Sequence, residues 1–289
     1  MSTAEPRPFC WDSGGLSLHA AEWGEPAAPL VVLHHGWLDQ CRSWDAVAAP
    51  LSQRFRVVVP DARGHGDSEW VGAGGTYYFP DYLLDLHRLL DALGAEKPVA
   101  LVGHSMGGSV VGYFAGAFPA RVSHLALLEG FGPPTEPPDL FPARLAGFVK
   151  TVEAARREPE VMASLEDAVR RLRRADSLLT EPVAAHMALH ATRPVPGGIA
   201  WKADPLHKAR SGGAFVLEHA MALWRRIECP VLSLDGERTA FRWPDLPDRR
   251  AAVRGLQHHV VPGAGHNLHA HAPSAVVAHL LGFLGDPPG

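Results

Sequence analysis

The sequence predicts an α/β fold in which a mostly parallel central sheet is flanked by helices and interrupted by an inserted helical cap. Two observations lead to this prediction. In the first half of the chain, short apolar runs that end at turn residues alternate with helix-like segments, as in right-handed βαβ units. After residue 131 these runs give way to a long, charged, helix-like stretch, and they return at about residue 230.

Each element of the predicted core rests on its own pattern. Four buried strands are expected at the apolar runs 30–33, 56–59, 99–102 and 124–128. Apolar residues from Phe79 to Leu93 recur at three- and four-residue spacing, which predicts an amphipathic helix that ends at Gly94. Two later strands, at 230–236 and 258–261, and a last helix at 273–284 complete the core.

The insertion is expected to begin where prolines exclude both strand and helix. Gly132-Pro133-Pro134 and Pro137-Pro138 follow the fourth strand directly. From about residue 140 to residue 224 the pattern is helical and shows no convincing strand. We therefore predict a core formed by residues 1–131 and 225–289, with a helical cap formed by residues 132–224.

The composition is that of an ordinary globular protein. Apolar residues make up 46% and charged residues 20% of the chain, and the net charge of −4 gives no reason to expect a nucleic-acid partner. No apolar run approaches the roughly 20 residues of a membrane helix. We expect a cytoplasmic monomer or homodimer with no membrane partner. The basic residues cluster once, in a run typical of a solvated helix face: Arg170, Arg171, Arg173 and Arg174.

The strongest chemical signal in the chain is Gly103-His104-Ser105-Met106-Gly107. It lies between a predicted strand and a predicted helix, so the chain must turn tightly at the serine. Such a turn holds its central residue in strained backbone angles, and the flanking glycines leave room for it. The hydroxyl then stands at the carboxyl edge of the sheet, where open α/β sheets bind their ligands. We predict that Ser105 is a nucleophile.

Together with this turn, three further motifs resemble the α/β-hydrolase fold family. They are His34-His35-Gly36-Trp37 after an early strand, the segment 60–68 (PDARGHGDS), and 263–267 (GAGHN), and they occur in the family's order. Shorter motifs at 35–39, 128–132 and 201–205 are similar to bacterial serine hydrolase-like proteins. The resemblance implies a hydrolase that needs no cofactor and acts on a small-molecule substrate.

The base and the oxyanion hole are predicted from their places relative to the strands. His266 follows the last strand through a loop and precedes the last helix, as a triad base requires, and His269 is the fallback. The oxyanion hole is expected from the backbone N–H groups of Met106, directly after the nucleophile, and Trp37, in the loop after an early strand. The Trp37 side chain is a further candidate for lining the acyl pocket.

The acid is the point at which the sequence departs from the family pattern. The family usually takes it from a G-x-x-D loop beyond the insertion, but here that loop is Gly236-Glu237-Arg238-Thr239. Glu129 directly follows the strand at 124–128, a position from which certain haloalkane dehalogenases take their acid, and neighbouring strand ends lie only about 5 Å apart. We predict Glu129 as the acid, with Asp235 or Glu237 as alternatives.

These residues predict a serine hydrolase that cleaves a small to medium apolar ester, thioester or lactone through an acyl-enzyme. Two alternatives stay open: a carbon–carbon bond hydrolase with the same triad, and a non-catalytic binding protein of the same fold. An apolar pocket is expected from the cap residues Phe141, Phe148, Met162, Met187, Leu189 and Trp201. No metal site is expected, because His186 and His190 lie four residues apart on a predicted helix without an evident third ligand.

Overall fold

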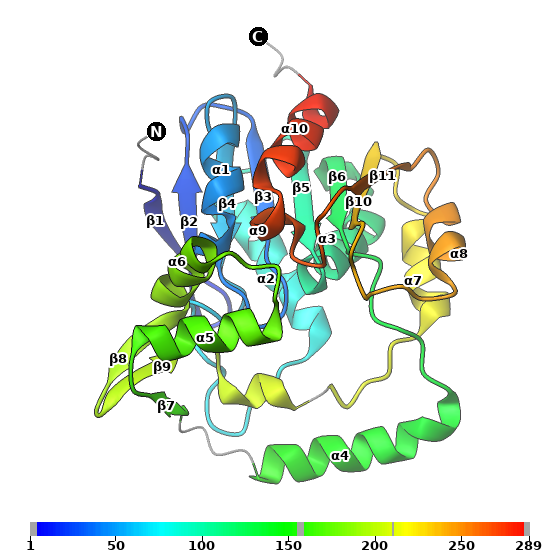
Figure 1. Ribbon diagram of the computed structural model, residues 1–289. Helices are drawn as coiled ribbons and strands as arrows, with labels where there is room; N and C mark the ends of the chain where they lie inside the picture. The colour runs from blue at the N-terminus through cyan, green and yellow to red at the C-terminus, as the bar shows by residue number, and fades with distance from the viewer. Residues whose placement is uncertain (1–4, 155–158, 210, 286–289) are drawn as a thin grey trace.

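A computed structural model describes residues 5–154, 159–209 and 211–285. Its centre is an eight-stranded sheet in the order β1-β2-β4-β3-β5-β6-β10-β11 (Figure 1). Neighbouring strands from β4 to β11 in this order are parallel, whereas β1 and β2 pair in antiparallel fashion at one edge. The predicted fold class, a mostly parallel sheet between helices, is confirmed.

All six strands predicted from apolar runs are present, and their bounds are β3 (Leu30–His34), β4 (Arg56–Pro60), β5 (Val99–His104), β6 (Val122–Leu128), β10 (Val231–Gly236) and β11 (Gln257–Val261). The sequence prediction missed β1 (Arg7–Asp12) and β2 (Ser17–Trp23). β1 is the outermost strand and four of its six residues are exposed, so it carries no continuous apolar run.

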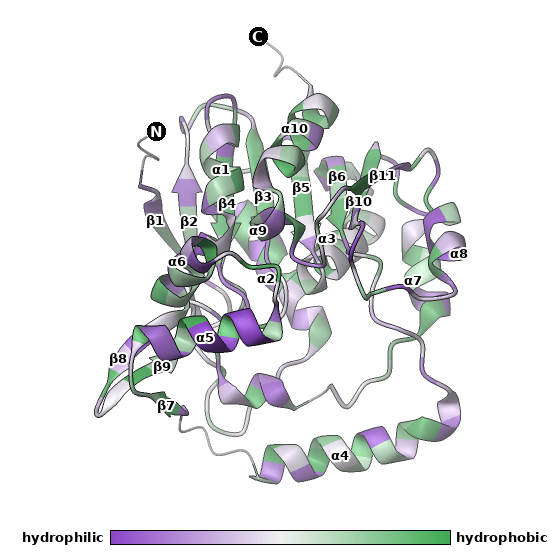
Figure 2. Cartoon of the chain, viewed as in Figure 1, coloured by the Kyte–Doolittle hydropathy of each residue, from purple (hydrophilic) through white to green (hydrophobic). Residues whose placement is uncertain are grey.

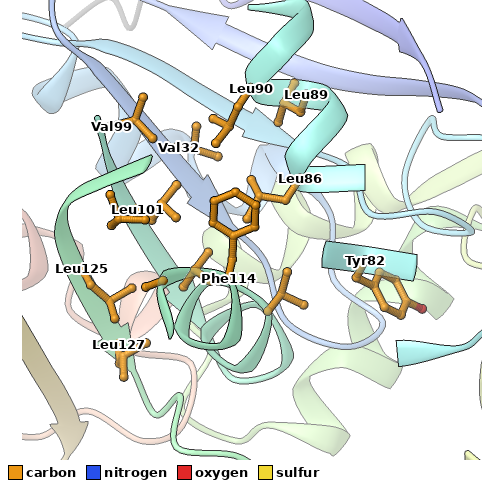
Figure 3. Packing of buried hydrophobic residues seen from close by; sticks show 14 of the residues in the cluster. Val32, Tyr82, Leu86, Leu89, Leu90, Val99, Leu101, Phe114, Leu125 and Leu127 are labelled. Carbon is orange, nitrogen blue, oxygen red and sulfur yellow. The ribbon is translucent and has the colours of Figure 1, made fainter. Parts of the chain in front are cut away.

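Helices cover both faces of the sheet (Figure 1). One face carries α1 (Asp45–Leu51), α9 (Leu268–His271) and α10 (Pro273–Leu284). The other carries α2 (Phe79–Ala92), α3 (Met106–Ala117) and α7 (Leu217–Trp224). On that second face, Phe114 of α3 lies among aliphatic side chains of α2 and of strands β3, β5 and β6 (Figure 3). Two apolar layers therefore hold the sheet, and its carboxyl edge stays free for a site.

The connections complete the core. Gly94 follows α2 with φ +66°, a conformation that favours glycine, so the predicted end of this helix is confirmed. The short helix α8 (Leu246–Ala251) lies between β10 and β11. Short 3₁₀ helices are η1 (Cys41–Trp44), η2 (Pro119–Arg121), η3 (Pro138–Leu140) and η4 (Pro205–Lys208).

The insertion is not purely helical. Besides α4 (Phe141–Ala154), α5 (Leu165–Ala175) and α6 (Glu181–Ala191), it contains the strands β7 (Val161–Met162), β8 (Thr192–Val195) and β9 (Gly198–Trp201) in a separate antiparallel sheet. The prediction of a segment without strands was wrong, because strands of two to four residues give no periodic signal. Residues 155–158 and 210 of the predicted cap lie outside the described part of the chain.

Two helices of the predicted cap segment behave differently from the rest. α7 packs against α3, and its Trp224 is fully buried in the core. α4 stands away from the body of the molecule and has no buried residue (Figure 1). Its apolar side chains, among them Phe141, Leu145 and Val149, are exposed, and Figure 2 shows hydrophobic residues along its length. Across the described ranges, no helix combines the length and hydrophobicity needed to cross a bilayer.

Candidate active site

Ser105 forms the turn between β5 and α3 with φ +51° and ψ −113°. Glycine neighbours make this strained turn possible. A Cβ atom at Gly103 would lie 2.4 Å from the Gly107 carbonyl oxygen, and one at Gly108 would lie 2.4 Å from Gly130 Cα. The Ser105 N–H donates to the Leu128 carbonyl at 2.9 Å, so the turn is tied to the end of the next strand. The hydroxyl is thereby held at the carboxyl edge of the sheet, as the motif predicted.

The loop after β3 lies directly against this turn. A Cβ atom at Gly36 would lie 2.9 Å from His104 Nδ1 and 3.4 Å from Ser105 Cβ, so Gly36 leaves room for the nucleophile. Leu38 takes φ +58° just after Trp37, which fixes the loop in an unusual conformation. The Trp37 side chain is 54% exposed and does not line the cavity described below. The expectation that this indole lines the pocket was therefore wrong, and only its backbone is left as a candidate.

Glu129 lies at the end of β6 with φ +53°, and three groups contact its carboxylate. It accepts hydrogen bonds from the Gly236 N–H at 2.8 Å and from Thr239 Oγ1 at 3.0 Å, and its Oε2 lies 3.5 Å from His266 Nδ1. An ionised carboxylate can only accept, so it favours the tautomer in which Nδ1 carries the proton. His266 Nε2 is then left with a free lone pair. Thr239, at the position where the resemblance leads us to expect an acid, thus donates a hydrogen bond to the Glu129 carboxylate.

The two alternative carboxylates are engaged elsewhere. Asp235 is paired with the Arg250 guanidinium, and its Oδ2 lies 3.0 Å from His258 Nε2. Glu237 accepts a hydrogen bond from the Gly263 N–H at 2.9 Å, which braces the loop before His266. Of the three candidate acids, Glu129 is the one that the described structure brings to the His266 ring.

His266 is held by two neighbours that no sequence motif revealed. The Phe241 ring stacks on its imidazole, with centroids 4.0 Å apart and planes inclined by 28°. His104 Nε2 lies 2.9 Å from the His266 carbonyl oxygen, which can only accept, so His104 donates there. Burial, together with the neighbouring His269 and His266, holds the pKa of His104 well below its usual value, which keeps the ring neutral.

The fallback base, His269, lies beneath the site and does not line the cavity. It is fully buried, stacks on Trp44 with centroids 4.6 Å apart, and places Nε2 3.3 Å from Asp39 Oδ2. Burial alone would raise the pKa of Asp39, but His269 and the Ser43 hydroxyl outweigh it and bring that pKa below its usual value. This buried pair stabilises the loop below His266.

Ser105, His266 and Glu129 line one cavity of about 290 Å³. Most of its wall is apolar, and the lining residues are Phe79, Ser105, Met106, Ser109, Glu129, Gly130, Phe131, Gly132, Pro133, Pro134, Asp235, Phe241, Trp243, Leu246 and His266. The expectation that Phe141, Phe148, Met162, Met187, Leu189 and Trp201 form the pocket was wrong, because none of them lines the cavity. Met162 and Trp201 pack inside the insertion, and Phe141 and Leu189 are exposed. From the predicted cap, the wall contains only the proline-rich arm, residues 132–134, and the segment before α8 supplies another part of it.

Metal-ligating side chains also gather in three places within the described ranges, with their ligand atoms inside 4.8 Å of one another. The groups are Asp39, His104 and His269; Asp45, His186 and His190; and His19, Cys41 and Asp61. The second group supplies the third partner, Asp45, that the sequence did not reveal beside the two histidines. Its carboxylate already pairs with Arg42 at 2.8 Å and with His186 at 3.1 Å, so these contacts tie α6 to the core.

Known proteins with similar sequences and structures agree with this fold. The family model described as "alpha/beta hydrolase fold" matches residues 29–165. A serine hydrolase-like protein of Danio rerio is 27% identical over 283 residues, which cover 92% of this chain and 85% of that protein.

Two solved structures extend the likeness over nearly the whole length. A hypothetical protein of Pseudomonas aeruginosa PAO1 is 32% identical with a TM-score of 0.87, and the match covers 96% of this chain and 99% of the other. The thioesterase domain from the curacin biosynthetic pathway is 28% identical with a TM-score of 0.84 and the same coverage. The chain therefore belongs to the α/β-hydrolase fold family, and serine hydrolase-like proteins are among its relatives.

Proposed function

We propose that this protein is a serine hydrolase that cleaves a small to medium apolar ester, thioester or lactone through an acyl-enzyme. One observation carries the proposal: Ser105, His266 and Glu129 line a single, largely apolar cavity, with the carboxylate on the Nδ1 side of the imidazole. A distance of 3.5 Å is long for a hydrogen bond, but such contacts often tighten only when substrate is bound.

Each of these residues has a defined role in the proposed reaction. His266 Nε2 takes the proton of Ser105 as its oxygen attacks the substrate carbonyl, and Glu129 stabilises the imidazolium that results. The carbonyl oxygen becomes an oxyanion and is held by the N–H groups of Met106 and Trp37. His266 then protonates the leaving alcohol or thiol. Water, deprotonated by the same imidazole, hydrolyses the acyl-enzyme and regenerates Ser105.

The dimensions of the cavity support a small-molecule substrate. A volume of about 290 Å³ lies at the lower end of the range, about 300–1,000 Å³, typical of small-molecule sites. Its wall of aromatic and proline side chains favours an apolar acyl group. The likeness to a thioesterase domain supports including thioesters with oxygen esters.

Labelling with a fluorophosphonate probe tests the proposal. The wild-type protein is expected to be labelled, and Ser105→Ala is expected to abolish both labelling and hydrolysis of 4-nitrophenyl esters from acetate to octanoate. Wild-type protein that resists the probe would favour the binding-protein alternative. Labelling without turnover of any ester, thioester or lactone would favour the carbon–carbon bond hydrolase.

A further inference from the structure

The cavity contains a hydroxyl that the proposed chemistry does not use, that of Ser109. The other polar side chains of the lining are engaged: Asp235 pairs with Arg250, and Trp243 Nε1 donates to the Gly132 carbonyl at 3.2 Å. Glu129, His266 and Ser105 belong to the proposed triad. Within the described ranges, no hydrogen bond is found for the Ser109 side chain, although the residue is only 6% exposed.

Ser109 lies one helical turn beyond the nucleophile. Its N–H donates to the Ser105 carbonyl at 3.1 Å, so Ser109 lies in the first turn of α3, close to the strained turn that carries Ser105. Some buried polar atoms of the protein lack a hydrogen-bond partner and are inaccessible to solvent, but the Ser109 hydroxyl is not one of them. The hydroxyl is therefore accessible, and the residue lines the cavity.

The surroundings limit what this hydroxyl can bind. A serine hydroxyl can both donate and accept, so it suits an alcohol group, and an unpaired polar group facing an apolar wall gains from such a partner. Glu129 and Asp235 line the same cavity, so a free carboxylate on the acyl chain would meet like charge. The matching group is therefore a neutral hydroxyl.

We propose that Ser109 recognises a hydroxyl on the third carbon of the acyl group, so that the substrates are neutral esters or thioesters of small 3-hydroxy acids. This inference rests on the proposed function, because the acyl carbon must be bonded to Ser105 Oγ. In this proposal the acyl chain passes Ser109 along the cavity wall that both serines line, and its third carbon carries the hydroxyl that Ser109 binds. A hydroxyl on the second carbon would lie beside the reacting carbonyl instead.

The test compares matched esters. The ratio of kcat/KM for 4-nitrophenyl 3-hydroxybutyrate to that for 4-nitrophenyl butyrate is measured for wild type and for Ser109→Ala. We expect a ratio above one in wild type and a fall of about 3- to 10-fold in Ser109→Ala, the effect of one neutral hydrogen bond. The 2-hydroxybutyrate ester is the positional control, and its ratio to butyrate is expected to be the same in both proteins.

Each other outcome has a defined meaning. An equal 3-hydroxybutyrate ratio in the two proteins, or a wild-type preference for butyrate, would overturn the inference while the proposed function stands. Ser109→Thr keeps a hydroxyl and should keep the preference, and the rate of fluorophosphonate labelling reports whether each variant is folded. Absence of both labelling and ester turnover in wild type would remove the proposed function and this inference with it.

Discussion

Thr239 and the backbone of Gly236 hold the carboxylate of Glu129, the acid proposed for the triad. Thr239 stands where the family usually has aspartate, and its hydroxyl donates to Glu129 Oε2 at 3.0 Å. The Gly236 N–H donates to the other carboxylate oxygen at 2.8 Å. Both donors come from the end of β10 and the loop that follows it. The loop after β10 therefore holds the Glu129 carboxylate at the end of β6.

Glu129→Gln should lower kcat by about 10⁴-fold, the loss seen when a triad carboxylate becomes an amide, because the imidazole loses its tautomer control and its counter-charge. Ester hydrolysis under saturating substrate measures the effect. Asp235→Asn is the matched control and should retain most of the activity, since Asp235 faces Arg250 and His258. The reverse ranking of the two variants would show that the acid is Asp235.

A carboxylate introduced at residue 239 is expected to restore part of the activity that Glu129→Gln loses. In the double variant Glu129→Gln/Thr239→Asp, a carboxylate stands where the Thr239 hydroxyl is now, 3.0 Å from Glu129 Oε2 and in the same loop as in the family pattern. We expect kcat to recover at least 10-fold over Glu129→Gln alone, a change of about 1.4 kcal/mol in the activation barrier. A folded double variant with no recovery would contradict this view of the loop.

The candidate roles of Ser105, His266 and Glu129 were expected from where these residues stand relative to the predicted strands, whereas the contacts around His266 were not. Ser105 and His266 follow directly from the turn after β5 and the loop after β11, and Glu129 follows from its place after a buried strand. Phe241 and His104 could not be assigned in the same way. Phe241 lies in the loop between β10 and α8, and only the folded chain brings its ring onto His266. His104 ends β5, and its contact with the His266 carbonyl likewise depends on how the loop after β11 folds back.

At the scale of elements, the insertion contacts and holds the loop that carries His266. Asp176, at the end of α5, accepts hydrogen bonds from Asn267 Nδ2 at 2.6 Å and from the Leu178 N–H at 3.0 Å, and it lies 2.9 Å from His271 Nε2. Burial alone would raise the pKa of Asp176, but these three partners outweigh it and lower that pKa to about 2. One carboxylate of the insertion therefore fixes the chain on the C-terminal side of His266.

Low pH should weaken the contacts between Asp176 and the loop after His266. The pKa of Asp176 is below its usual 3.8 in the folded protein, so its contribution to stability is complete above about pH 4 and is lost as the pH falls toward 2. We expect Asp176→Asn to unfold at lower temperature than wild type at pH 6, with the difference shrinking below pH 4. Asp139→Asn, at an exposed position, is the control. A difference in melting temperature that stays constant with pH would contradict the assignment.

Strands with a continuous apolar run were predictable, including β11, although four of its five residues are exposed, whereas β1, β2 and the short strands of the insertion were not. β3, β4, β5 and β6 appear as continuous apolar runs because helices cover both of their faces. β1 lies at an edge, and β7 has only two residues, so neither has a periodic pattern. The pocket wall was misplaced for a different reason: hydrophobic composition does not reveal whether Met162 faces the site or its own small cluster.

At the scale of the whole molecule, Arg249 joins the two core segments on either side of the insertion. It is fully buried and donates to the carbonyls of Phe131 at 2.7 Å and Pro133 at 2.8 Å. A second nitrogen of the guanidinium pairs with Asp245 at 2.7 Å, and the group lies 5.0 Å from the Phe215 ring centroid. These hydrogen bonds attach the proline-rich arm that lines the cavity to α8.

Arg249→Leu should lower the free energy of unfolding by about 3 kcal/mol, because it leaves two carbonyls and a carboxylate without their donor. Urea unfolding measures the change. Arg254→Leu, at an exposed position a few residues later, is the control and should stay within about 0.5 kcal/mol of wild type. Equal effects of the two substitutions would show that Arg249 does not join the segments.

The position of Glu129, the proposed acid, at the end of β6 also has a consequence for the order in which the site is synthesised. The oxyanion loop, Ser105 and Glu129 all precede residue 132, whereas the proposed base, His266, lies beyond the entire insertion. With the proposed triad, Ser105 and Glu129 are therefore synthesised before the imidazole that would activate the serine hydroxyl. Acylation of Ser105 by a fluorophosphonate is thus expected only for chains that extend past His266.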